Sequence, residues 1–295
     1  MLDYKKIIKN RELRLQLINC LSWIPDEPYL KMVSRIKIGQ KLDLKNPKGY
    51  NEKQNWLKLH DIHPEYTELV DKLGVRKIIK EQLGEEYLIP LLGSWEKFED
   101  IDFNLLPEQF VLKCSHDSGS VKVIKDKSKM DKDSLRKFFT GRLRLNSFVL
   151  GREYPYRKVK PMIIAEKFMQ EDGADDLKDY KFLCFNGEPQ FVFVVNDRSG
   201  TCTMDYYDMN FKRVPMRNRN HANSDVDAPM PTNFELMKDF ARQLSKGTRF
   251  VRMDFYDING RVYFGEFTFF DGGGFSIVDP PEWERKLGDM IALEN

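Results

Sequence analysis

Hydrophobic positions follow a helical spacing in the first part of the chain. From Leu2 to Lys58 the pattern is interrupted at "IPDEPYL" and "LKNPKGYN", where prolines and a glycine predict turns between helices. The segment "HPEYTELVDKLGVRKIIKEQLGEEY" keeps this spacing and is predicted to end near Gly84. Residues 1–60 are therefore predicted to form a helical N-terminal segment.

Runs of β-branched and aromatic residues dominate the rest of the chain. The stretches "YLIPLLGSWEKF", "PMIIAEKFM" and "YYDMNFKRVP" predict strands, and "QFVLKCSHDSGSVKVI" predicts a hairpin. "DYKFLCFNGEPQFVFVVNDRSG" predicts an antiparallel pair that turns at "NGEP". Two further stretches, "KSKMDKDSLRKFFTGRLRL" and "NFELMKDFARQLSKGT", predict helices. This order indicates an α+β protein with at least two lobes.

One predicted hairpin carries an acid in each of its apolar strands. In "RFVRMDFYDINGRVYFGEFTFFDGGGF", residues 249–275, these acids are Asp254 and Glu266. Ionised acids on a half-buried sheet face are costly unless they are paired or bound to a metal. Arg252 and solvent would satisfy them on the simplest interpretation. The alternative is Mg²⁺, which takes one or two carboxylates and leaves positions for phosphate oxygens and water.

The register of this hairpin decides whether the two acids act together. A two-residue loop at "NG" would place them on opposite faces, because side chains alternate along a strand. A three-residue loop of residues 258–260 would instead pair Asp257 with Arg261 and place Arg252 opposite Glu266. Asp254 would then lie diagonally from Glu266 on the same face. The hypothesis of a magnesium–nucleotide site requires this second register.

A donor set for phosphate is present in "FVLKCSHDSGSVKVI". Lys113 ends a predicted strand, and residues 115–120 form a small loop whose N–H groups and hydroxyls are suited to phosphate oxygens. The sequence contains neither GxxxxGK[ST] nor a GxGxxG that opens a helix after a strand. A plain hairpin turn therefore remains the alternative interpretation.

Composition narrows the class of protein. Hydrophobic residues make up 41% of the 295 positions and charged residues 32%, which is typical of a globular chain. The formal net charge of +2 predicts no nucleic-acid partner. The four cysteines are scattered, and charges interrupt the N-terminus throughout. We therefore expect reduced thiols, no secretory signal, no membrane span and a cytoplasmic protein, with a peripheral position at the inner membrane face as a further expectation.

In combination these motifs resemble the TupA-like ATP-grasp family of bacterial surface-polysaccharide gene clusters. The similarity runs from "NPKGYNEKQNWLKL" through "FVLKCSHDSGSV", "LGREYPY", "IIAEKFM" and "LKDYKFLCFNGEP" to "VRMDFY" and "FGEFTF". It implies an ATP-grasp fold in which two α+β lobes clasp ATP within residues 61–295. The nucleotide-clasping lobe is expected at about 105–165 and the metal and substrate lobe at about 170–295.

The resemblance also implies roles for individual residues, with ATP and Mg²⁺ as cofactors. The implied ATP contacts are Lys72, Lys113, the flap residues Ser118, Gly119 and Ser120, and the hinge residues Glu166 and Lys167. The implied reaction-site residues are Lys181 as a phosphate or substrate contact, Arg252 as a neutralising cation, and Asp254 and Glu266 as metal ligands. One position departs from the family: many members carry Asn two residues after the metal Glu, where this chain has Thr268. Asp271 is a candidate to compensate.

The resemblance implies an ATP-dependent carboxylate–amine ligase that acts through an acyl-phosphate. Its expected substrates are small-molecule or glycan-linked carboxylates and amines, such as a uronic acid or peptide component of a cell-surface polysaccharide, including a membrane-associated glycan acceptor. A glycosyltransferase-type enzyme and a non-catalytic nucleotide-binding module are the alternatives. Arg152 and Arg157 in "GREYPYRKVKP" are candidate anion contacts, and His116 is a candidate base or phosphate donor.

Overall fold

The computed structural model describes residues 18, 20–174, 176–196 and 202–293. The chain divides into two compact units, which are described separately below. The five-stranded unit contains residues 26–62 and 170–295, and the four-stranded unit contains residues 63–169 with residues 2–25. The helical pattern predicted before residue 18 lies outside the described residues.

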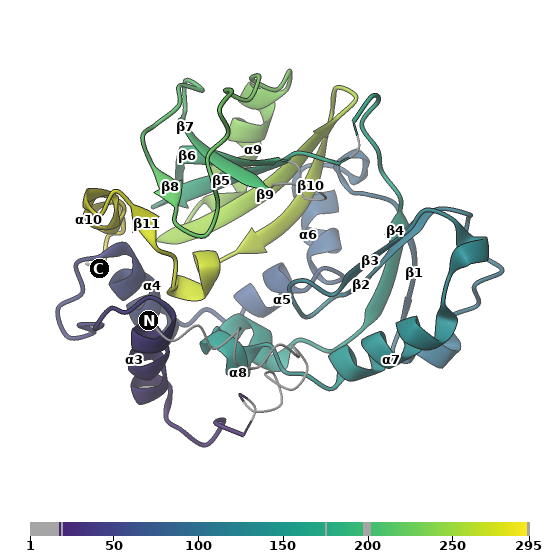
Figure 1. The fold of residues 1–295 in the computed structure, drawn as a ribbon, viewed down its shortest axis with the longest axis horizontal. Coiled ribbons are helices and arrows are strands. Elements are labelled where there is room, and N and C mark those ends of the chain that lie inside the picture. The colour runs from purple at the N-terminus through teal and green to yellow at the C-terminus, as the bar shows by residue number, and fades with distance from the viewer. Residues whose placement is uncertain (1–17, 19, 175, 197–201, 294–295) are drawn as a thin grey trace. The chain divides into compact units, whose positions relative to one another are not determined.

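An antiparallel sheet in the order β10-β9-β5-β6-β7 forms the centre of the five-stranded unit (Figure 1). Its strands are β5 (Asp179–Phe185), β6 (Glu188–Asn196), β7 (Thr203–Asp208), β9 (Phe250–Ile258) and β10 (Arg261–Thr268). Helix α9 (Phe234–Ser245) packs on one face, where Phe234 stacks on Phe182 at 5.7 Å between ring centroids. Because side chains alternate along each strand, the other face is left for the polar residues described below.

Smaller elements complete the five-stranded unit. They are α3 (Asp26–Lys37), α4 (Tyr50–His60), β8 (Arg217–Asn218), the 3-10 turn η5 (Asp271–Gly274), β11 (Val278–Asp279) and α10 (Glu282–Met290). Helix α4 packs against both α10 and η5. Residues 26–60 of the predicted N-terminal segment are thus grouped with residues 170–295 rather than with the residues that directly follow them.

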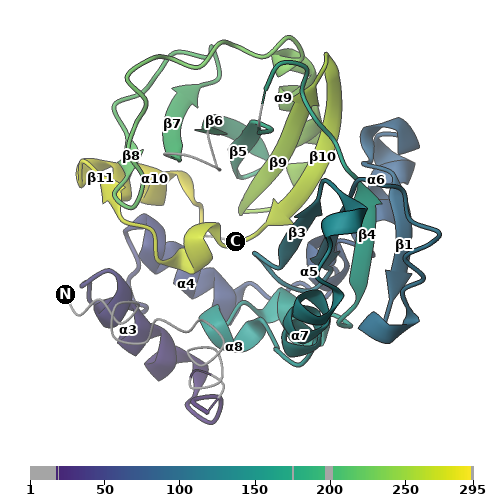
Figure 2. The ribbon, with the colours of Figure 1, turned by 45° about the vertical axis from the view of Figure 1, so that its right-hand side comes forward.

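A second antiparallel sheet, in the order β1-β4-β2-β3, organises the four-stranded unit. Its strands are β1 (Leu91–Trp95), β2 (Phe110–Cys114), β3 (Val121–Ile124) and β4 (Ile163–Lys167). Its helices are α5 (Tyr66–Val70), α6 (Val75–Gln82), α7 (Lys132–Leu143) and α8 (Phe148–Gly151). Alternate residues of β2, namely Phe110, Leu112 and Cys114, are fully buried in a core that includes Leu135 and Phe139 of α7. Figure 2 shows the ribbon of this unit, with β1, β3, β4 and α7 labelled.

The predicted α+β class is confirmed, and every strand and helix segment predicted between residues 61 and 268 contains an element of the predicted type. One placement differs: Lys72 lies in the turn between α5 and α6 rather than on a helix. Among the residues that the structure describes, no helix is long and apolar enough to cross a lipid bilayer.

Candidate functional site

A row of side chains crosses the open face of the five-stranded sheet. Glu266 on β10 is paired with Asp254 on β9, Asp254 with Lys181 on β5, and Lys181 with Phe193 on β6. Directly paired residues of antiparallel strands point to the same face, so these side chains are neighbours. Asp254 is 2% exposed and forms an ion pair with Lys181. The two predicted metal carboxylates therefore lie together.

The hairpin loop that brings these two carboxylates together differs from the predicted three-residue loop. Arg261 pairs with Ile258, so the loop is Asn259 and Gly260 alone, with φ angles of 51° and 73°. These positive angles suit the two-residue turn typical of Asn-Gly hairpins. The prediction of a three-residue loop is wrong, and so is the placement of Arg252 opposite Glu266, because Arg252 pairs with Thr268.

A β-bulge places Glu266 on the same face of the sheet as Asp254, although the loop has only two residues. The register shifts by one residue between Phe264 and Glu266, at Gly265. If Gly265 were paired in the regular register, the two-residue loop would place Glu266 opposite Met253, on the face that α9 covers. The bulge thus turns Glu266 to the face of Asp254.

Gly265 is predicted to be required for this alignment. A Cβ atom at this position would lie 2.9 Å from the carbonyl oxygen of Asp254 and 3.2 Å from its Cβ atom. We expect Gly265→Ala to lower the free energy of unfolding by about 2 kcal/mol, because backbone must shift to accept the methyl group. Urea unfolding would measure the loss.

Gly260→Asn is the matched control in the same hairpin, because a Cβ atom there meets nothing within 4 Å. Asn also tolerates the positive φ of this turn. If Gly265→Ala were as stable as this control, the proposed role of the bulge would be wrong.

Arg252 connects three carboxylates on this face. Its Nε and Nη2 atoms donate to the two oxygens of Asp254 at 2.7 and 2.8 Å. Nη2 also donates to Glu266 at 3.0 Å, and Nη1 donates to Asp271 at 2.8 Å. Burial lowers the pKa of Arg252, but the charges of Asp254, Asp271 and Glu266 outweigh it and hold the pKa well above its ordinary value. The guanidinium is therefore permanently charged.

The charge balance of this cluster favours a cation. Three carboxylates face two cations, Arg252 and Lys181, so one negative charge is in excess. Within the described residues, no group of three or more His, Cys, Asp and Glu side chains is arranged to hold a metal ion alone. Mg²⁺ does not need such a group, since it commonly takes one or two carboxylates and completes its shell with phosphate and water. Asp254 and Glu266 fit this requirement.

Thr268 fills the position where Asn was expected. Its Oγ1 atom donates to Glu266 at 3.3 Å. The hydroxyl thus orients a carboxylate, whereas an amide oxygen would serve Mg²⁺ directly as a ligand. The third acid of the cluster, Asp271, comes from η5 rather than from the hairpin.

The four-stranded unit carries a second charged group. Lys113 Nζ lies 2.6 Å from Glu166, and Arg76 Nη1 lies 3.5 Å from the same carboxylate. Val111 pairs with Glu166, which places Lys113 and Glu166 on the face opposite the apolar core. Burial lowers the pKa of Arg76, and the charge of Glu166 opposes this shift. Glu166 therefore fixes the position of Lys113.

Two side chains from outside the loop between β2 and β3 form hydrogen bonds with the backbone of this loop. Lys72 Nζ donates to the carbonyl of Asp117 at 2.6 Å. Arg142 of α7 donates to the carbonyl of Gly119 at 3.2 Å and lies 3.4 Å from the Asp117 carboxylate. The predicted ATP contact Lys72 is thus joined to the predicted flap.

Within this loop, the predicted flap residues differ in exposure. Ser118 and Gly119 are exposed, whereas Ser120 is 1% exposed. The Ser120 hydroxyl donates to Asp117 and accepts the N–H of Cys114 at 3.0 Å. Of these three residues, Ser118 and Gly119 therefore lie at the surface of the loop.

Two of the candidate substrate residues are buried. His116 is 2% exposed, its Nε2 atom lies 3.2 Å from the carbonyl of Arg142, and burial lowers its pKa. Arg152 is 1% exposed, and its guanidinium donates to the carbonyls of Leu21 and Ile24 at 2.9 and 3.2 Å. Arg152 thus joins backbone segments of its own unit, and its role as a substrate contact stays a prediction.

Arg157 and Lys167 are exposed, and their predicted roles stay predictions. Arg157 lies over the ring of Phe148, with 3.9 Å between the guanidinium carbon and the ring centroid. Lys167 lines an open hollow of about 660 Å³ with Lys125 and Phe168. Side chains alternate along β4, so Glu166 and Lys167 point to opposite faces of the sheet.

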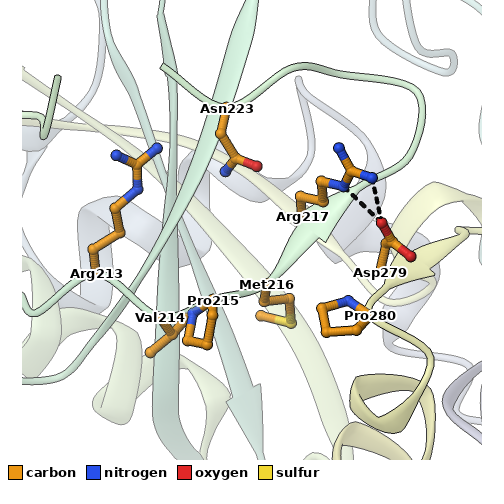
Figure 3. A pocket seen from close by; sticks show the side chains of 8 residues that line it. All are labelled: Arg213, Val214, Pro215, Met216, Arg217, Asn223, Asp279 and Pro280. Carbon is orange, nitrogen blue, oxygen red and sulfur yellow. Dashed lines mark hydrogen bonds and ion pairs between the residues drawn. The ribbon is translucent and has the colours of Figure 1, made fainter. Parts of the chain in front are cut away.

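A further hollow, of about 440 Å³, lies beside β8 and β11 (Figure 3). Two arginines line it, but Arg213 forms ion pairs with Asp205 and Asp227. Arg217 Nε donates at 2.7 Å to Asp279, its cross-strand partner on β11 (Figure 3). Because both charges are already neutralised, this hollow is poorly suited to nucleotide phosphates.

Sequence reasoning missed several residues of these groups. Arg76, Asp117 and Arg142 were not singled out, because a charged residue on a helix or in a loop most often faces solvent. Their partners are distant in sequence: Arg76 contacts Glu166 and Arg142 contacts Gly119. Only the folded structure reveals these pairs.

Comparison with known proteins gives a family and a fold. A family model described as TupA-like ATPgrasp matches residues 52–292. No curated protein sequence matches the chain. Among solved structures, D-alanine–D-alanine ligase from Bacillus anthracis complexed with ATP is 16% identical, with 91% of this chain and 82% of that chain covered and a TM-score of 0.46.

Two other solved ligases are similar at lower coverage. D-alanyl-alanine synthetase A from Vibrio cholerae is 11% identical, with 75% of this chain and 63% of that chain covered and a TM-score of 0.42. Phosphoribosylamine–glycine ligase from Thermotoga maritima is 12% identical, with coverages of 69% and 48% and a TM-score of 0.40. All three TM-scores lie below 0.5, so the assignment rests on the family model.

Proposed function

This chain belongs to the TupA-like ATPgrasp family, and we propose that it uses ATP to join a carboxylate to an amine. The family and the fold predicted from the sequence are confirmed, and the chain is an ATP-grasp enzyme. One observation carries the proposed reaction: Arg252, Asp254 and Glu266 meet on one sheet face with an excess of negative charge. A divalent cation and a polyphosphate together would complement this arrangement.

In the five-stranded unit, we propose that Asp254 and Glu266 hold Mg²⁺. The metal would neutralise charge on the phosphate oxygens of ATP. Lys181 and Arg252 both contact Asp254, and their positive charges lie on the same face. These two cations would stabilise the negative charge on the phosphoryl group during its transfer.

In the four-stranded unit, we propose that Lys113 binds phosphate oxygens together with the exposed loop residues Ser118 and Gly119. Glu166 positions Lys113, and Lys72 and Arg142 hold the loop. Such positioning is the main contribution of a protein to phosphoryl transfer, since the protein itself forms no covalent bond. Contacts of Glu166 and Lys167 with adenine and ribose remain a prediction from the family.

The proposed reaction has two steps. A substrate carboxylate oxygen forms a bond to the γ-phosphorus of ATP, and the bond to the bridging oxygen breaks, releasing ADP. The nitrogen of an amine then forms a bond to the acyl carbon of the acyl-phosphate, inorganic phosphate leaves, and the amine proton passes to solvent. Exclusion of water from the formation of the acyl-phosphate until the amine attacks it would protect this labile intermediate.

We further propose that one substrate is a uronic acid or peptide component of a cell-surface polysaccharide. This substrate class follows from the family resemblance alone. The ATP requirement agrees with action in the cytoplasm, including at the inner face of the membrane on a membrane-associated acceptor. An experimental test therefore has to compare several carboxylate substrates.

Trapping with hydroxylamine tests the reaction without knowledge of the natural amine. The purified protein would be incubated with Mg-ATP, hydroxylamine and a panel of uronic and amino acids, and hydroxamate and ADP would be measured. We expect both products in equal amounts and only with particular carboxylates. ADP release that is independent of every carboxylate, or thermal stabilisation by UDP-sugars but not by Mg-ATP, would contradict the proposal.

A further inference from the structure

One face of α4 is polar and yet completely buried. Asn51 and Asn55 are 0% exposed, and Lys58 is 3% exposed. Burying such groups is costly unless each one is hydrogen-bonded. A helix that carries them inward must therefore have a polar partner.

That partner is the segment from Asp271 to Ser276. Asn51 Nδ2 donates to the carbonyl of Ser276 at 2.7 Å, and Asn51 Oδ1 accepts the N–H of Ser276 at 2.9 Å. Asn55 Nδ2 donates to the carbonyl of Gly274 at 2.7 Å, and Lys58 Nζ donates to the carbonyl of Gly273 at 2.6 Å. We call Asn51, Asn55 and Lys58 the α4 clamp.

The turn can meet the clamp because it is built of glycines. Gly272, Gly273 and Gly274 have φ angles of 58°, 65° and 70°, which other residues rarely adopt. A Cβ atom at Gly274 would lie 3.0 Å from Asn55 Nδ2. Lys58 also lies over the ring of Phe275, 4.7 Å from its centroid. The clamp thus fixes both the backbone and the end of the turn.

Asp271 is the first residue of this turn, and its carboxylate reaches Arg252 on the sheet face that carries Asp254 and Glu266. Its carboxylate is 2.8 Å from Arg252 Nη1. Arg252 shares its other donors between Asp254 and Glu266, the two proposed metal ligands. A metal ion on those two carboxylates would compete with Arg252 for them, whereas the bond to Asp271 would be retained.

We propose that the α4 clamp fixes Asp271 as the anchor of Arg252, so that Asp254 and Glu266 can exchange the guanidinium for Mg²⁺. Asp271 and the clamp residues are positioning residues in this scheme, which rests on the proposed function. Without Asp271, Arg252 would bind the other two acids more strongly, and the site would also lose one negative charge. Both effects weaken Mg²⁺ binding.

The test measures Mg²⁺ binding without turnover. Thermal unfolding of the whole protein would be followed with saturating ADP over a series of Mg²⁺ concentrations, for wild type, Asp271→Asn and Lys58→Met. We expect the half-saturating Mg²⁺ concentration to rise about tenfold in Asp271→Asn, a typical cost of losing a group that supports metal ligands. A smaller rise in the same direction is expected for Lys58→Met.

Lys53→Met is the matched control. Lys53 lies on the same helix and also donates to a backbone carbonyl, that of Ile291 at 2.7 Å, but this carbonyl is outside the turn. We expect its melting temperature without ligand to fall while its half-saturating Mg²⁺ concentration stays within twofold of wild type.

The outcomes separate the two proposals. If wild type responds to Mg-ADP but Asp271→Asn and Lys58→Met respond at the same Mg²⁺ concentration as wild type, the clamp is structural only and the inference is overturned. If wild type itself shows no response to Mg-ADP, the proposed function fails and the inference fails with it. Should Asp271→Asn not fold, Lys58→Met decides.

Discussion

Asp254→Asn is expected to reduce ATP-dependent hydroxamate formation by at least about a thousandfold, the scale on which loss of a transition-state electrostatic contact lowers kcat. Asp254 is 2% exposed and contacts both Lys181 and Arg252. Its replacement removes a proposed metal ligand and releases two cations that it holds in place. The assay is hydroxamate formation at saturating ATP and Mg²⁺.

Asp257→Asn is the control on the same strand. Asp257 lies an odd number of residues from Asp254, so its side chain points to the opposite face, where it accepts hydrogen bonds from Asn233. We expect it to retain most activity. The Asp254→Asn protein should remain folded, because Glu266 and Asp271 still pair with Arg252. More than a tenth of wild-type activity in folded Asp254→Asn would contradict the assigned role.

The same hairpin illustrates how far the sequence can predict a site. The two strands and the pair of acids follow from alternation and residue type, but the face of Glu266 depends on the single register shift at Gly265. A glycine inside a strand is a known signal for a bulge. The signal does not state which way the register moves, so the correct side of the sheet was predicted with the wrong loop.

Buried polar groups were the other limit of prediction from sequence. The stretch "YNEKQNWLKLH" is polar on the face that carries Asn51, Asn55 and Lys58, and in sequence such a face is typical of a solvated helix. Its partners are backbone carbonyls more than two hundred residues away. Residue types alone do not indicate such pairings, and the contacts of Arg152 with the carbonyls of Leu21 and Ile24 could not be predicted for the same reason.

Within the four-stranded unit, Glu166 is the residue whose replacement should most lower the stability of the fold. Its carboxylate is 8% exposed and balances Lys113 and Arg76, each 17% exposed. We expect Glu166→Gln to lower the free energy of unfolding by about 3 kcal/mol, since removing one partner leaves buried charges uncompensated. Urea unfolding without nucleotide would measure this loss. Glu96→Gln is the control, because its pair with Lys160 is exposed and such pairs contribute about 0–1 kcal/mol.

Addition of Mg-ATP distinguishes the two interpretations of Glu166. If Glu166 mainly orients Lys113, the phosphates of ATP replace the missing negative charge, and the stability difference between Glu166→Gln and wild type should shrink at saturating ATP. If Glu166 instead contacts the ribose, as the family resemblance implies, ATP binds the variant more weakly, and the difference should widen at equal ATP concentration. In one ATP titration, the stability difference between Glu166→Gln and wild type should therefore shrink under the first interpretation and widen under the second. The ion pairs of Glu166 with Lys113 and Arg76 favour the first outcome, and a widening difference would overturn it.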